Sequence, residues 1–370
     1  MKKKIIFCAK NLDIGGIERA VINYVNYLDK SKYEVYLYLS KKEGIYQDSI
    51  NEDIKILNFD ISEDKNVFIR KLKNAFKLLY FTIRYYHKFD FAADFATPIK
   101  NCGILAKRFS KNNAIWFHGP YWSNTDEANK FLKYVNADKY KKVVFVSDYL
   151  KKLYLEIRPH SNQKLYVINN PINYQEMLKK SNEKIIAKKT KVTILNVGRH
   201  EERSKKLSVL LAVTKKLLNE KYDFELWLVG DGEDNQMYRD MVNNLKLNNN
   251  VKFFGKQNNV FPYYKQCDAI ILTSAYEGNP VVYLEGKVLN KPIISTDVSD
   301  AKIELSGYGI VTSKDEKSIY YGLKEFLDKG YDIKKPFDPK KYNNETFYKL
   351  IKVIEERWYN AKNKCHSTCI

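Results

Sequence analysis

The sequence predicts an α/β protein built from two doubly wound domains. Its 370 residues are too many for one ordinary core and fit two α/β domains of about 150–200 residues. The chain opens with a strand, a Gly-Gly turn, a helix and a second strand, which is a βαβ unit. Between residues 192 and 297 the order of strand, Gly-containing turn and helix repeats four times. This alternation is typical of a parallel sheet covered by helices.

Composition excludes several other classes of protein. Hydrophobic residues make up 44% of the chain and aromatic residues 14%, which favours a packed globular protein over a disordered one. The formal net charge of +20 allows nucleic acid, anionic membrane or phosphorylated substrates as partners. We find no base-stacking platform or recognition motif, so we expect no nucleic acid. The five cysteines lack CxxC spacing, which argues against a disulfide framework or a zinc site.

The first half of the chain predicts seven strands, several of them followed by polar turns. The apolar runs that predict them are Lys4–Ala9, Glu34–Leu39, Ile54–Leu57, Phe91–Phe95, Ala114–Phe117, Val143–Val146 and Leu165–Ile168. Lys10 and Asp13 follow the first run at once, so it is too short for a signal peptide, and we expect a cytoplasmic protein. Gly15-Gly16 is either a tight turn or a close approach to a phosphate or sugar. His118 is either a packed loop residue or part of a functional rim.

The segment 67–88 predicts an amphipathic helix with two distinct faces. At ~100° per residue, Arg70, Lys73, Lys77, Arg84 and Lys88 form a basic stripe. A separate broad apolar face carries Ile69, Leu72, Phe76, Leu79, Ile83 and Tyr86. Two interpretations remain open for this helix. Its apolar face either packs on a sheet, as in an ordinary surface helix, or lies on an anionic membrane.

The second half predicts a domain whose strands end in polar turns. A polar, lysine-rich stretch at 174–190 is a plausible hinge, which gives domains at 1–185 and 186–342 and a C-terminal helical segment at 343–370. One strand ends at Gly198-Arg199, and another ends at Gly255. Because the carboxyl ends of parallel strands form the ligand-binding edge of such a sheet, these turns are candidates for a site.

The stretch 273–297 is the strongest candidate. An apolar run there leads into a loop that carries Glu277, and Glu285 follows about two turns into a helix. Carboxylates and unpaired amides at a helix start suit a polyhydroxylated ligand. Alone, two solvated glutamates explain the pattern equally well. With Arg199 and Lys205 on the same edge, the set suits a sugar nucleotide, because cations neutralise a diphosphate.

Four motifs in order, GGIERA, VGR with Lys205 downstream, VGDG and EGNPVVYLE, resemble the retaining glycosyltransferases of family 4 (glycosyl transferases group 1). The resemblance spans nearly the whole chain. It implies the GT-B fold, in which two Rossmann-like domains face each other across a cleft and the C-terminal helix crosses back to the first domain. The last motif matches the family's E-x7-E signature at Glu277 and Glu285.

The resemblance also implies residue roles. The catalytic set would be His118, Glu277, Arg199 and Lys205. The donor-binding set would be Gly15, Gly16, Gly198, Arg199, Lys205, Lys206, Gly255, Asn279, Pro280, Val281, Val282 and Glu285. Glu277 would contact the transferred sugar and Glu285 the ribose. No bound metal or other cofactor is expected. The sequence departs from the family pattern at Lys206, Gly119 and Asn173. Because a lysine stands at 206, where the family usually has a small residue, either Lys205 or Lys206 is a candidate phosphate ligand.

The sequence thus predicts a cytoplasmic hexosyltransferase that uses a nucleotide-sugar, with a UDP-sugar expected. The acceptor would be a hydroxyl of a growing cell-surface glycan, which is either free or lipid-linked, and the protein would be peripheral on the inner membrane face in the second case. Two alternatives share the fold: a sugar-nucleotide epimerase and a non-catalytic glycan-binding subunit. The intact set of Arg199, Lys205, Glu277 and Glu285 argues against the non-catalytic subunit.

Overall fold

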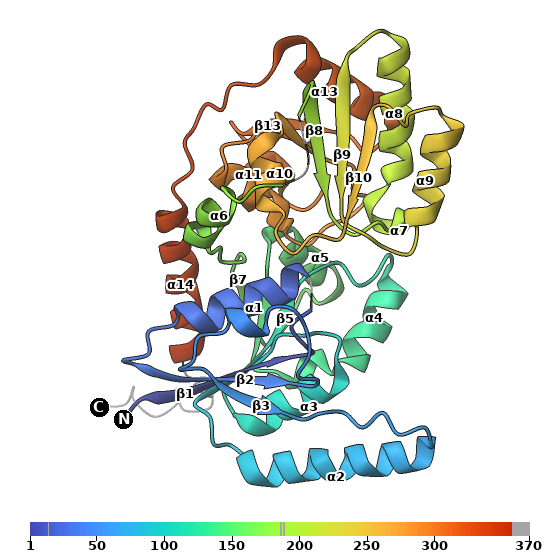
Figure 1. The fold of residues 1–370 in the computed structure, drawn as a ribbon. Coiled ribbons are helices and arrows are strands. Elements are labelled where there is room, and N and C mark those ends of the chain that lie inside the picture. The colour runs from blue at the N-terminus through green and yellow to red at the C-terminus, as the bar shows by residue number, and fades with distance from the viewer. Residues whose placement is uncertain (14, 186, 188, 357–370) are drawn as a thin grey trace. The chain divides into compact units, whose positions relative to one another are not determined.

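The computed structural model describes residues 1–356 except Ile14, Ile186 and Lys188, and the chain divides into two units (Figure 1). The N-terminal unit contains residues 1–146, 150–171 and those from 344 onward, and the C-terminal unit contains 147–149 and 172–343. The sequence placed these boundaries at 185/186 and 342/343. The stretch 174–190, expected to be a hinge, begins with helix α6 (Tyr174–Lys180) of the C-terminal unit.

The N-terminal unit is built on a seven-stranded parallel sheet in the order β3-β2-β1-β4-β5-β6-β7. Its strands are β1 (Lys3–Ala9), β2 (Tyr33–Leu39), β3 (Lys55–Asn58), β4 (Phe91–Asp94), β5 (Asn113–Phe117), β6 (Lys142–Phe145) and β7 (Lys164–Val167). Its helical elements are α1 (Gly16–Tyr27), η1 (Gln47–Ser49), α2 (Val67–Tyr85), α3 (Lys100–Phe109), α4 (Thr125–Tyr134), η2 (Ala137–Lys139) and α5 (Asp148–Ile157). All seven predicted strands are confirmed within one residue at each end, because each is a short run rich in apolar residues. Strands β4, β5 and β6 are fully buried, whereas the edge strands β3 and β7 are only partly buried.

Helix α14 (Pro339–Glu355) begins four residues before the C-terminal helical segment that the sequence placed at 343–370. The part of that segment after residue 356 lies outside the described residues. From residue 344 onward α14 belongs to the N-terminal unit. There Phe347 stacks on Tyr27 with ring centroids 4.2 Å apart, and the side chain of Asn112 donates to the carbonyl of Ile354 at 2.9 Å. Helix α14 is therefore fixed to this unit by both apolar and polar contacts.

The C-terminal unit is built on a six-stranded parallel sheet in the order β10-β9-β8-β11-β12-β13. Its strands are β8 (Val192–Val197), β9 (Phe224–Val229), β10 (Val251–Gly255), β11 (Ala269–Leu272), β12 (Ile293–Thr296) and β13 (Gly309–Thr312). Its other helices are α7 (Glu202–Lys205), α8 (Leu207–Asn219), α9 (Asn235–Asn244), α10 (Phe261–Gln266), α11 (Val281–Val288), α12 (Ala301–Glu304) and α13 (Glu316–Lys329). The prediction of two Rossmann-like parallel α/β domains is confirmed.

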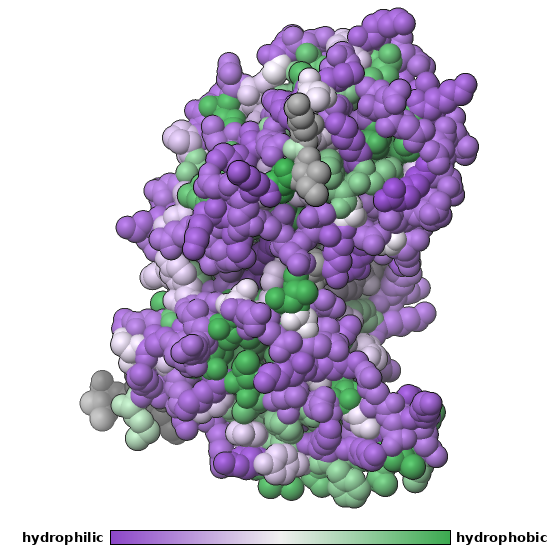
Figure 2. Space-filling model, in the orientation of Figure 1, coloured by the Kyte–Doolittle hydropathy of each residue, from purple (hydrophilic) through white to green (hydrophobic). Residues whose placement is uncertain are grey.

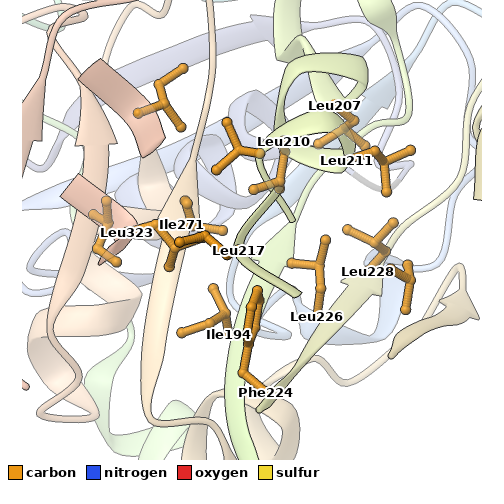
Figure 3. Close-up of a cluster of buried hydrophobic side chains, with 14 of the residues drawn as sticks. Ile194, Leu207, Leu210, Leu211, Leu217, Phe224, Leu226, Leu228, Ile271 and Leu323 are labelled. Carbon is orange, nitrogen blue, oxygen red and sulfur yellow. The ribbon is translucent and has the colours of Figure 1, made fainter. Parts of the chain in front are cut away.

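One buried cluster holds α8 and α13 on a face of this second sheet (Figure 3). Ile194, Leu226 and Ile271 come from three adjacent strands, and they meet Leu211 and Leu217 of α8. Each large side chain of this kind contributes about 1.5–3 kcal/mol when it is fully buried. The cluster therefore fixes the sheet, whose carboxyl edge carries the candidate site.

Candidate active site

Three loops at the carboxyl edge of the C-terminal sheet are joined by backbone hydrogen bonds. Gly198 N–H, after β8, donates to the carbonyl of Val229 at 3.0 Å, and Gly230 N–H, after β9, donates to the carbonyl of Gly255 at 2.9 Å. Gly230 has φ +141°, and a Cβ atom there would lie 1.8 Å from the carbonyl oxygen of Gly198. The VGDG motif is thus explained by packing, because only glycine lets the loop after β9 lie against the loop after β8.

Lys205 is held at the same edge by contacts between α7 and the loop after β11. The Thr273 hydroxyl donates to the carbonyl of Lys205 at 2.9 Å, and the N–H of Ala275 donates to the carbonyl of Ser204 at 2.8 Å. These bonds bring together two segments that lie about seventy residues apart in the chain. They place Lys205 beside Glu277.

Glu277 forms an ion pair with Lys205, and both side chains are only partly exposed, at 17% and 26%. The Ser274 hydroxyl also donates to Glu277 Oε1, at 2.8 Å. Both contacts use the same oxygen, Oε1. Within the part of the chain that the structure describes, Oε2 has no hydrogen bond. Glu277 therefore offers one fixed and uncommitted acceptor atom beside a cation.

Lys206 lies in a different position from Lys205. It joins α7 to α8 in the left-handed conformation, with φ 52° and ψ 41°. Such a conformation favours glycine or asparagine, which explains why a small residue suits this position. The ammonium group lies 3.8 Å from Glu202 and the side chain is 42% exposed. Of the two lysines, only Lys205 is paired with the predicted sugar-binding glutamate.

Arg199 follows Gly198 at the end of β8 and is exposed. Its guanidinium has no hydrogen bond or ion pair with any described residue. Gly198 itself lies close to Lys205, since a Cβ atom at Gly198 would be 3.6 Å from Lys205 Cε. The structure thus brings Gly198, Lys205 and Glu277 together. Arg199, the residue after Gly198, adds a cation that has no partner among the described residues.

Asn279 and Pro280 lead into α11, and Val281 and Val282 are the first two residues of the helix. No side chain caps the start of α11, so its first amides are left for another acceptor. The Ser299 hydroxyl donates to the carbonyl of Gly278 at 2.5 Å and fixes the loop. Glu285 lies further along α11, is only 4% exposed, and accepts from the Tyr264 hydroxyl at 2.5 Å. Glu285 is therefore buried, and the alternative that both glutamates are solvated does not hold for it.

The N-terminal unit carries the remaining predicted residues. Gly15 precedes α1, Gly16 is its first residue, and the N–H of Arg19 donates to the carbonyl of Gly15 at 3.1 Å. His118 follows β5 and is half-buried, with Nε2 3.0 Å from the carbonyl oxygen of Phe95. Since a carbonyl only accepts, Nε2 carries the proton, and the buried Nδ1 is left as an acceptor without a partner among the described residues.

Burial lowers the pKa of His118 to about 4, although the hydrogen bond to Phe95 acts in the opposite direction. An unfolded histidine has a pKa of about 6.5. Between these two values the unfolded chain binds more protons than the folded chain, so stability falls as the pH falls through this window.

We predict that His118→Gln reduces the loss of stability on acidification. Glutamine can still donate to the carbonyl of Phe95 but does not titrate. The wild-type free energy of unfolding should fall, relative to the variant, by at most about 1.4 kcal/mol per pH unit between pH 6.5 and 4. Urea denaturation at pH 7, 6 and 5 measures this difference. Parallel pH dependence in the two proteins would contradict it.

Sequence reasoning missed three residues that shape this site. Thr273 and Ser274 directly follow β11 and bond Lys205 and Glu277, respectively. Their place at a strand's carboxyl end was a usable signal. Tyr264, which bonds Glu285, lies in the short helix α10, and nothing in its spacing indicates this contact.

Two family models match the chain in succession. The model described as Glycosyltransferase Family 4 matches residues 14–176, and the model described as Glycosyl transferases group 1 matches residues 178–344. Lys205, Glu277 and Glu285 lie inside the second match, and His118 lies inside the first.

Named relatives agree with these matches. An uncharacterized glycosyltransferase of Methanocaldococcus jannaschii is 28% identical over 207 residues, which is 54% of this chain and 50% of that protein. An uncharacterized glycosyltransferase of Haemophilus influenzae is 27% identical over 305 residues, 80% of this chain and 81% of that protein. The N-acetylgalactosamine-N,N'-diacetylbacillosaminyl-diphospho-undecaprenol 4-alpha-N-acetylgalactosaminyltransferase of Campylobacter jejuni is 26% identical over 200 residues, 53% of each. The match thus spans about half the length of the first and third relatives.

Solved structures share the fold over almost the whole chain. HepE from Anabaena in complex with UDP has a TM-score of 0.69 at 16% identity, and the match covers 94% of this chain and 99% of HepE. A variant of S. aureus TarM in complex with fondaparinux, alpha-GlcNAc-glycerol and UDP has a TM-score of 0.75 at 11% identity, covering 96% and 100%.

Proposed function

Because the chain belongs to the GT-B glycosyltransferases of family 4, group 1, we propose that it is a retaining hexosyltransferase. The donor is a UDP-sugar, and the acceptor is a hydroxyl of a growing, lipid-linked glycan. The UDP complexes of HepE and TarM support the choice of nucleotide. The name of the Campylobacter relative supports a lipid-linked acceptor and an α-linked product.

The pairing of Lys205 with Glu277 is the observation that carries this proposal. Lys205 and Arg199 are the cations that meet the donor diphosphate and stabilise the charge that develops on the leaving phosphate oxygen. The free Oε2 of Glu277 accepts a hydrogen bond from a hydroxyl of the transferred sugar. Since Lys205 and Ser274 hold the other oxygen, the carboxylate is fixed before the donor arrives.

Retention is part of this proposal and rests on the family resemblance. Glu277 is assigned to hold the transferred sugar, and its Oε1 already accepts from Lys205 and Ser274. In the proposed step the bond from the anomeric carbon to the phosphate oxygen breaks as the bond to the acceptor oxygen forms on the same face. The acceptor proton passes to the departing phosphate oxygen, so that no protein group changes its protonation state.

The start of α11 follows Glu277 closely in the chain, and Gly198 lies close to Lys205. We therefore assign Gly198 and the first backbone amides of α11 to the donor as well. The contact of Glu285 with the ribose, and the parts played by Gly255, Gly15, Gly16 and His118, stay predictions. Of the two candidate phosphate ligands, we assign Lys205 and not Lys206 to the donor. We also propose that transfer needs no bound metal, since Arg199 and Lys205 supply the positive charge. Turnover that persists in EDTA would agree with this, and restoration of lost turnover by Mg²⁺ or Mn²⁺ would contradict it.

A panel of nucleotide-sugars tests the proposed function. At about 100 times its dissociation constant, a true donor should raise the unfolding temperature by about 5 °C. We expect UDP-hexoses to do so, and slow release of UDP should follow in the absence of acceptor. NMR of the released sugar should show the α-anomer first. Conversion of the donor to its epimer without acceptor would favour the epimerase instead, and no stabilisation by any donor would favour the non-catalytic subunit.

A further inference from the structure

Helix α2 exposes a continuous apolar face to solvent. Six large side chains form this face, with exposed fractions from 46% to 75%, namely Phe68, Leu72, Phe76, Leu79, Tyr80 and Ile83. Figure 2 shows hydrophobic atoms along the edge of the molecule where Figure 1 places α2. Single exposed apolar residues are ordinary, but a contiguous set on one helix marks an interaction surface. The sequence left open whether this face packs on a sheet, and the structure excludes that interpretation.

A different face of α2 packs against the rest of the N-terminal unit. Phe81 is buried, with its ring 5.8 Å from the ring of Tyr38 and 5.7 Å from that of Phe59. Asn74, on the same side, accepts from the N–H of Ser62 at 2.8 Å. At ~100° per residue the exposed apolar side chains lie roughly opposite Phe81. The fold therefore uses one side of the helix and leaves the other side free.

The charges on α2 are all of one sign. The helix carries Arg70, Lys71, Lys73, Lys77 and Arg84 and no Asp or Glu. Four of these cations form the stripe between the packed face and the exposed apolar face. Asp64, just before the helix, pairs with Lys73 at 2.8 Å, and Glu63 pairs with Lys41. The cations that remain border the exposed apolar face with no carboxylate on the helix to neutralise them.

We propose that α2 lies flat in the interface of an anionic lipid bilayer. The apolar face enters the boundary between head groups and acyl chains, and the basic stripe meets the lipid phosphates. No helix among the described residues is long and apolar enough to span a bilayer, which limits α2 to the interface. A second copy of the chain fits less well, because symmetric pairing of this face would bring two basic stripes together. The inference goes beyond the transfer reaction, since no proposed donor-site residue lies on α2.

Flotation with lipid vesicles tests the proposal on the full chain. Wild-type protein should bind vesicles of phosphatidylcholine and phosphatidylglycerol at about 7:3, and bind pure phosphatidylcholine at least tenfold more weakly. Binding to the anionic vesicles should fall in 0.5 M NaCl. The triple variant L72S, F76S and I83S should lose at least tenfold in partitioning. The matched control, I303S with Y321S, removes two exposed apolar side chains of the C-terminal unit and should bind like wild type.

A second variant separates the two parts of the surface. The substitutions R70Q, K73Q, K77Q and R84Q should abolish the preference for anionic lipid, and the control K302Q, K314Q, K317Q and K329Q should keep it. Unchanged partitioning of either α2 variant, with circular dichroism like that of wild type, would overturn the proposal. So would a wild-type dimer that the triple variant converts to monomer without loss of vesicle binding, since the face would then join two chains. Stabilisation by UDP-sugar should be the same in wild type and both α2 variants, so failure here is distinct from failure of the proposed transferase function.

Discussion

Glu277→Ala should lose sugar transfer almost completely, with kcat lowered by about 10²–10³-fold. The substitution removes the carboxylate that we propose holds the transferred sugar, and it releases Lys205 from its partner. Because both side chains are partly solvated, the loss of the ion pair should change the free energy of unfolding by less than about 1 kcal/mol. Steady-state kinetics with donor and acceptor, together with urea denaturation, measure the two effects separately.

Two further variants make this result specific. Glu277→Gln keeps the shape of the side chain and removes its charge, so a large loss in this variant assigns the effect to the carboxylate. Glu325→Ala removes an exposed glutamate of the same unit and should leave kcat unchanged. Wild-type turnover by Glu277→Ala would contradict the assignment of Glu277 to the transferred sugar.

Lys205→Ala should lower kcat/KM by about 10²-fold or more, whereas Lys206→Ala should stay within about threefold of wild type. The two lysines are neighbours in sequence but have different partners, because Lys205 contacts Glu277 and Lys206 lies near Glu202. Each variant is thus the control for the other. Initial rates over a range of donor concentrations provide the comparison.

Equal losses in both lysine variants would show that the left-handed turn at Lys206, and not the charge of Lys205, governs activity. A loss confined to Lys206→Ala would move the phosphate ligand to that residue. In either outcome the proposed role of the pair formed by Lys205 and Glu277 would be wrong.

Most strands were predictable because they are short apolar runs, and those in the middle of the sheets, such as β5 and β9, are fully buried. Strand β13, at the edge of its sheet and only partly buried, was not predicted, and neither was helix α3. Helix α3 is short and contains Gly103, and glycine disfavours a helix interior. In the structure a Cβ atom at Gly103 would lie 2.7 Å from the hydroxyl of Tyr140, so the glycine serves close packing within a helix.

The candidate site was predictable only in part. The sequence placed Lys205 and Glu277 at a common edge of the sheet, and the structure brings these two residues together, but their partners Thr273 and Ser274 were missed. That Lys205 and not Lys206 contacts Glu277 depends on the left-handed turn at Lys206 and on the bond from Thr273 to the carbonyl of Lys205. The spacing of the two lysines in the sequence indicates neither of these features.

Helix α2 shows the same limit for a surface. Its hydrophobic periodicity identified the helix and both of its faces correctly. Periodicity alone does not tell which face meets the core. The side that packs inward carries Phe81, which contacts Tyr38 and Phe59. The larger apolar face remains outside, and this is what turns an amphipathic pattern into a proposed membrane contact.

The most direct test of the proposed donor site is calorimetric titration of wild-type protein, Lys205→Ala and Lys206→Ala with UDP, GDP and ADP. The account predicts that UDP binds most tightly to wild type, that Lys205→Ala weakens this binding at least tenfold, and that Lys206→Ala leaves it unchanged. The account would be contradicted if none of the three nucleotides bound to wild type. It would also be contradicted if UDP bound equally tightly to wild type and Lys205→Ala.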